Sequence, residues 1–139
     1  MKRGLTLIEL SFVLAVISLL VAVTVPVYQT LVLRARAEEA RAMLSAIAHA
    51  ELRHHRDHGA FLECSTEPTR VPIAFPSERP CWRALGISTE APVRFSYQVV
   101  LDGGSFAVLA GADLDGNNVA SRYTLDGRTL TLTVENELE

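Results

Sequence analysis

Hydrophobic residues follow three patterns along this chain, and the first is an unbroken apolar run. No residue from Leu10 to Leu33 is charged. At a rise of ~1.5 Å per residue, a helix from Leu5 to Val27 would be roughly 35 Å long, enough to cross the hydrocarbon core of a bilayer. The run therefore predicts a membrane-compatible helix.

The second pattern is also helical, but it is apolar on one side only. Apolar residues recur at spacings of three and four along one stripe, which comprises Leu33, Ala37, Ala40, Leu44 and Ile47. Gly59 is a typical stop signal. We therefore predict one helix from about Leu5 to His58, with its second half packed on a sheet. Proline lacks a backbone donor, so we expect a bend near Pro26.

The third pattern has a period of two, which is typical of strands. It covers Val93–Leu101, Phe106–Ala110, Val119–Leu125 and Leu130–Val134. Asp-Gly pairs at 102–103 and 126–127 indicate hairpin turns. The fold class that follows is α+β, with a long N-terminal helix packed on a C-terminal antiparallel sheet.

Residues 59–92 separate the helix from the strands and read as an irregular loop. They contain five of the six prolines and both cysteines, Cys64 and Cys81. In an exported domain such a pair predicts a disulfide, which would stabilise a loop of this size by about 3 kcal/mol. In a cytosolic chain the same residues would more often be free thiols.

The N-terminus begins like a secretory signal, but it differs from an ordinary cleaved signal peptide. Lys2 and Arg3 precede the apolar run, but the run is too long and no small-x-small cleavage site closes it. A single-span anchor is the simplest interpretation. Glu9 does not suit an anchor, because a carboxylate costs about 2.5–3.5 kcal/mol at the centre of a span and less near its edge.

The segment Gly4-Leu5-Thr6-Leu7-Ile8-Glu9, between a short basic leader and a long apolar helix, resembles the prepilin motif of type IV pilins. The resemblance implies cleavage after Gly4, N-methylation of Leu5 and the same α+β fold. Leu5 stands where the family usually has Phe. Pro26 matches a proline that marks a flexible stretch of the family's helix, whereas Ser18 stands where many members have Gly.

The resemblance also implies how the chain is divided and where it resides. Residues 1–4 would be the leader, 5–33 the transmembrane and polymerisation helix, and 34–139 a globular head containing the loop 59–92 and a sheet over 93–135. The chain would span the bacterial inner membrane once and then enter an extracellular filament. Its partners would be identical or related pilin subunits, the prepilin peptidase and methyltransferase, and the inner-membrane assembly platform.

Three functions remain open on the sequence. The first is a major or minor pilin of a type IV pilus, serving adhesion, twitching motility or DNA uptake. The second is a pseudopilin of a type II secretion system. The third is an anchored binding domain that does not polymerise, against which Gly4 and Glu9 argue together. In the first two, Glu9 would pair with the amine of Leu5 during assembly.

Composition narrows the chemistry further. Thirteen Lys and Arg against sixteen Asp and Glu give a formal net charge of −3, so direct nucleic-acid binding is not expected. The sequence has no nucleophile elbow, phosphate-binding loop or paired catalytic acids. We therefore expect neither enzymatic activity nor a cofactor.

Two clusters resemble metal sites only in part. His54 and His58 are four residues apart, a spacing that can hold zinc, but no metalloprotease signature surrounds them. Asp113, Asp115 and Asn117 are weak calcium candidates, and some pseudopilins bind calcium near this region. The spacing is not that of an EF-hand, because Gly116 is fourth and Thr124 is twelfth, so we interpret the segment as a turn.

Overall fold

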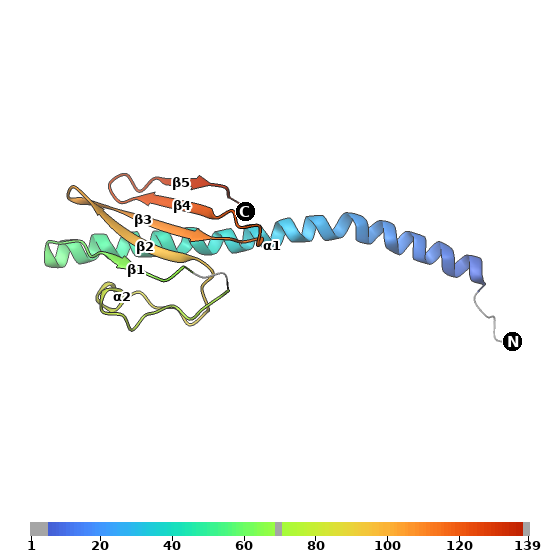
Figure 1. The fold of residues 1–139 in the computed structure, drawn as a ribbon, viewed down its shortest axis with the longest axis horizontal. Coiled ribbons are helices and arrows are strands. Elements are labelled where there is room, and N and C mark those ends of the chain that lie inside the picture. The colour runs from blue at the N-terminus through green and yellow to red at the C-terminus, as the bar shows by residue number, and fades with distance from the viewer. Residues whose placement is uncertain (1–5, 69–70, 138–139) are drawn as a thin grey trace. The chain divides into compact units, whose positions relative to one another are not determined.

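The computed structural model describes residues 6–68 and 71–137, and the chain divides into two compact units, Met1–Arg34 and Ala35–Glu139. Helix α1 (Leu7–His58) begins in the first unit and ends in the second. The second unit also contains a short helix α2 (Pro80–Leu85) and a five-stranded sheet (Figure 1).

The later part of α1 packs on the sheet, as its apolar stripe predicts. Ala37, Ala40, Leu44 and Ile47 are each at most 2% exposed. Ala48 and Ala50 are also buried, and so many small side chains permit a close approach of the helix backbone to the sheet. In Figure 1 this part of α1 runs along one face of the strands.

The sheet is a sequential antiparallel meander. Its strands are β1 (Cys64–Ser65), β2 (Ser96–Asp102), β3 (Ser105–Ala112), β4 (Ser121–Asp126) and β5 (Leu132–Glu135), in the order β1-β2-β3-β4-β5. Side chains alternate between faces. The buried residues of the inner face are Tyr97, Val99, Phe106, Val108, Ala110, Ala112, Ser121, Tyr123 and Leu125. The predicted α+β fold is confirmed.

The ends of three predicted strands were placed wrongly. Val93 forms only an isolated bridge with Ile73, and β2 begins at Ser96. Val119 and Leu130 are exposed and lie outside strands. Leu130 has a left-handed backbone (φ 55°) and its N–H donates to the Asp126 carbonyl, so it belongs to the turn before β5.

The prediction of an irregular loop over residues 59–92 was also wrong in part, because the segment contains β1 and α2. Pro80 opens α2, where its missing N–H costs nothing, and Gly86 closes it with φ 68° and an N–H bond to the Arg83 carbonyl. Phe75, Trp82 and Leu85 are buried, and the Trp82 ring packs edge-on against Phe75. This segment therefore contributes its own part of the core.

Candidate functional site

The first turn of α1 is capped by the side chain of Thr6, the residue before the helix. The Thr6 hydroxyl accepts the N–H of Glu9 at 3.3 Å, which places Thr6 at the N-cap and Glu9 at the third helical position. A carboxylate in the first turn is also favoured by the helix dipole. Glu9 therefore has a local role that sequence reasoning missed, although Thr-x-x-Glu is a known capping signature.

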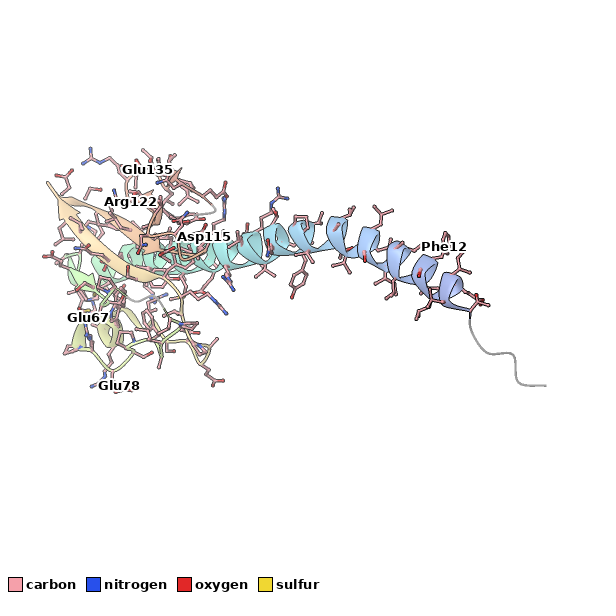
Figure 2. All side chains as sticks on the ribbon, turned by 45° about the vertical axis from the view of Figure 1, so that its right-hand side comes forward. Phe12, Glu67, Glu78, Asp115, Arg122 and Glu135 are labelled. Atoms are coloured by element: carbon pink, nitrogen blue, oxygen red, sulfur yellow. The ribbon has the colours of Figure 1, made fainter. Side chains whose placement is uncertain are left out.

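The rest of the first unit exposes its apolar side chains on every face of the helix. Leu7 is 84% exposed, Ile8 78% and Phe12 71%. Figure 2, in which Phe12 is labelled, shows side chains projecting all around this part of α1. Among the described residues α1 is the one helix long and apolar enough to span a membrane, and its most apolar 18-residue window is 0% buried. Such a surface requires an apolar environment.

Four serine and threonine hydroxyl groups in this stretch are already satisfied within the helix. Ser11, Ser18, Thr24 and Thr30 each donate to the carbonyl oxygen four residues earlier, at 2.8–3.1 Å. Such bonds shield polar groups from hydrocarbon. No other residue from Thr6 to Leu33 carries a charge, so Glu9 is the single ionisable carboxylate of the apolar stretch.

Pro26 lies inside α1, and the helix continues through it as an unbroken ribbon (Figure 1). The Thr30 hydroxyl donates to the Pro26 carbonyl. Proline has no N–H, so the helix lacks one backbone bond at this point. Gly4 and Leu5, the predicted cleavage and methylation residues, lie outside the described residues.

Cys64 and Cys81 are brought together from β1 and α2, but in this structure both are free thiols. The Cys81 side chain is within hydrogen-bonding range of the Cys64 thiol. Burial raises the pKa of Cys64 well above its usual value, and Cys81 and Glu51 add to the effect. The predicted disulfide stays a prediction, since the pair is adjacent but unbridged.

Glu51 is a buried acid that sequence reasoning did not single out. It is 0% exposed on α1, its Oε2 accepts the N–H of Leu62 at 3.0 Å, and its Oε1 has no partner among the described residues. Burial raises the pKa of this carboxyl, and the Leu62 bond and the charge of His54 offset part of the rise. The Leu62–Glu51 hydrogen bond holds the segment that follows α1 against the helix.

In the acidic turn, residues 113–118, the carboxylate oxygens accept hydrogen bonds from the backbone of the turn itself. The two carboxylate oxygens of Asp113 accept the N–H groups of Gly116 and Asn118, at 2.7 and 3.1 Å. Asp115 accepts both the backbone N–H and the side-chain amide of Asn117. The arrangement is that of a turn closed by Asp and Asn side chains.

The histidines cap the far end of α1. The rings of His54 and His58 stack at 4.3 Å, and each Nδ1 bonds a carbonyl, that of Ala60 and that of His54 respectively. The ring of His55 stacks on Phe61 at 4.1 Å. Within the described ranges no three His, Cys, Asp or Glu side chains form a group able to hold a metal ion.

Comparison with known proteins gives two similar sequences, both described as "Type IV major pilin protein PilE1" from Neisseria gonorrhoeae. Each is 35% identical to this chain over 66 residues, which is 48% of this chain and 40% or 37% of the relative. The chain thus matches less than half the length of these relatives. No family model matches the sequence. No solved structure matches it.

These matches agree with the resemblance seen in the sequence. The observed fold, a long helix whose apolar start is exposed and whose later part packs on an antiparallel sheet, is the architecture that the resemblance implies. The chain is therefore similar to type IV major pilins over about half its length, and its fold agrees with that similarity.

Proposed function

We propose that this chain is a structural subunit of a type IV pilus, polymerised through the N-terminal part of α1. The observation that carries the proposal is an apolar helix exposed on all faces with one carboxylate, Glu9, at its start. In an anchor that does not polymerise, that carboxylate would serve only the first turn of its own helix. The similarity to major pilins supports a structural role.

In the proposed pathway a peptidase cleaves after Gly4 while the chain spans the inner membrane. The new amine of Leu5, methylated once, is still a cation at neutral pH. In an apolar filament core this amine and the Glu9 carboxylate are each costly alone, and they neutralise one another when they meet. The pair forms at one axial offset between neighbouring subunits, so it defines the register of the helices.

The proposed partners follow from this pathway. They are further copies of the chain or related pilins, the peptidase and methyltransferase, and an assembly platform in the inner membrane. The mature filament is extracellular and serves adhesion, twitching motility or DNA uptake.

The test must separate the charge of Glu9 from its place in the helix cap. Glu9→Gln removes the charge and keeps a side chain suited to the capping position. Glu9→Asp keeps the charge on a shorter chain, and Glu9→Ala removes both. Ser11→Ala is the control for a polar change on the same stretch. The measurement is the ratio of subunit in sheared filaments to subunit in membranes, with intact masses for both fractions.

We expect Glu9→Gln and Glu9→Ala to reduce filament content at least tenfold, because each leaves the Leu5 amine unpaired, at a cost of about 1.4 kcal/mol or more. Ser11→Ala should assemble normally. All masses should correspond to a chain beginning at Leu5 with one methyl group. Normal assembly of Glu9→Gln would show that the carboxylate serves only the helix cap and would refute the pairing. Assembled filaments that retain residues 1–4 would refute the processing step.

A further inference from the structure

A small cavity in the second unit is bordered by two arginines. It has a volume of about 220 Å³, and it is lined by Arg36, Pro72, Arg94, Ala112, Asp113 and Leu114. These residues come from α1, from the segment before β2, and from the end of β3 with the turn that follows it. The cavity is distinct from the apolar helix surface and from Glu9.

The guanidinium of Arg36 is held in place but not neutralised. Its Nη1 donates to the Leu114 carbonyl at 2.8 Å. Among the described residues no carboxylate lies within ion-pair distance of Arg36, because the ion pairs found involve other arginines. A guanidinium has five N–H donors, so most of those of Arg36 remain for a ligand.

Arg94 is held by an ion pair with Glu39, an acid that does not line the cavity. Glu39 accepts the Arg94 backbone N–H at 2.7 Å and its Nη1 at 3.3 Å. Asp113 does line the cavity, but both of its oxygens already accept backbone N–H groups of the turn. The cavity wall therefore carries two guanidiniums and one carboxylate; Arg94 is ion-paired with Glu39, and Arg36 is the cation without an ion pair among the described residues. Two guanidiniums that line one cavity are well suited to a phosphate group.

The position of Arg36 in the sequence indicates where such a phosphate would come from. Arg36 follows the last residue of the apolar run, Leu33, by three residues of continuous helix, or roughly 4–5 Å. With the run in a bilayer, this places Arg36 at the depth of the lipid headgroups. The overall charge of −3 gives no general attraction to an anionic surface, so binding would depend on these two side chains.

We propose that Arg36 and Arg94 bind the phosphate of a membrane phospholipid headgroup before the subunit leaves the membrane. The proposal rests on the membrane-inserted stage of the proposed function. The site holds lipid while the helix is in the membrane, and it empties when the helix moves into a filament.

The experiment uses the full chain in non-ionic detergent and counts retained lipid by native mass spectrometry. The probes are phosphatidylglycerol, and diacylglycerol as the same lipid without phosphate. The variants are Arg36→Gln, Arg94→Gln and both together. Arg56→Gln is the matched control, an exposed arginine on the same helix with no ion pair among the described residues. Circular dichroism verifies that each variant is folded.

We expect the wild type to retain phosphatidylglycerol over diacylglycerol, and each single variant to bind it about fivefold more weakly. Arg56→Gln should bind like the wild type. Equal weakening by Arg56→Gln, or no weakening by Arg36→Gln, would overturn the proposal. Displacement of lipid by inorganic phosphate alone, with no preference for the lipid, would assign the site to free phosphate and overturn the lipid source. Filament assembly of the Glu9 variants is a separate readout, so failure here leaves that proposal standing, and the reverse also holds.

Discussion

At the scale of single residues, one missing side chain fixes the turn between β4 and β5. Gly127 is buried, and its N–H donates to the Phe106 carbonyl at 2.8 Å. A Cβ added at Gly127 would lie 2.5 Å from both that carbonyl oxygen and the Phe106 ring. The backbone oxygen cannot move without disturbing β3, so the position excludes every other residue.

Gly127→Ala is therefore expected to destabilise the second unit by about 1–3 kcal/mol, the usual cost of overpacking. The measurement is thermal unfolding of the full chain in detergent, followed by near-ultraviolet circular dichroism of the buried aromatic residues. Gly111→Ala is the matched control, since its added Cβ would meet only ordinary contacts, the nearest at 3.7 Å. Equal stability of the two variants would show that the turn adjusts freely.

Glu51 predicts a pH dependence of stability whose sign follows from its raised pKa. A carboxyl whose pKa is higher in the folded chain stabilises the fold fully below its unfolded pKa, and this contribution is lost as pH rises through the folded pKa. Glu51→Gln keeps an acceptor for the Leu62 N–H and removes the titration. We expect it to be more stable than the wild type by about 1 kcal/mol at neutral pH, with the difference vanishing toward pH 4.

Denaturant titrations of the full chain across this pH range would measure the effect. Glu63→Gln, a change at an exposed acid, should show no such trend. A Glu51→Gln variant that is less stable at neutral pH would mean that the ionised carboxylate makes a favourable contact, with His54 the candidate partner.

At the scale of elements, the two cysteines lie where two short elements of the second unit meet, a place also linked by Arg79 before α2, whose Nη1 donates to the Ser65 carbonyl at 3.1 Å. Cys64 is on β1, a two-residue edge strand, and Cys81 is on the six-residue helix α2. Neither element is long enough to be stable alone. The Arg53 guanidinium, which donates to the Leu85 carbonyl at 3.0 Å, is one further link from α2 to α1.

We predict that Cys64 and Cys81 are bridged in the exported chain. Alkylation under denaturing, non-reducing conditions should label neither residue. Denaturant is needed because the raised pKa of Cys64 makes the folded thiol unreactive at neutral pH. Cys81→Ser, which leaves Cys64 without a partner, should give one labelled thiol. Two labelled thiols in exported wild type would refute the bridge.

Reduction should then increase hydrogen exchange in β1 and α2 while β2, β3 and β4 stay protected. These three strands are joined by full ladders of backbone pairs, from Ser96↔Gly111 to Ala112↔Ser121, and carry their own aromatic core. Simultaneous loss of protection in all strands would show instead that the bridge stabilises the whole sheet.

At the scale of the whole molecule, the hydrophobic periodicity of the sequence predicted the long elements that bury one face. The stripe of α1 and the alternation of β2, β3 and β4 were readable because each element buries one face. The bounds of β5 were not, since Leu130 belongs to a turn set by the Asp126 side chain, which accepts the N–H groups of Arg128 and Thr129. Apolar character at Leu130 carried no information about that turn.

The short elements and the internal contacts could not be predicted from hydrophobic periodicity. Pro80 and Gly86 do mark the start and end of α2, but six residues are too few to show a helical period. Glu51 reads as one more polar residue on a helix until the Leu62 N–H is found beside it. Glu9 was singled out for its place in an apolar run, whereas its cap depends on the hydroxyl of Thr6.

The four hydroxyls of the apolar stretch that bond their own helix have a consequence for how the subunit can travel. Because Ser11, Ser18, Thr24 and Thr30 bond within the helix, these four side chains require no polar partner outside it. Tyr28 and Gln29 are the other uncharged polar side chains of this length. Acyl chains and the apolar side chains of other subunits are then nearly equivalent surroundings for these four positions. The helix can therefore exchange between lipid and filament in either direction. Shape complementarity, and whether the Glu9 carboxylate is paired, decide which direction is favoured.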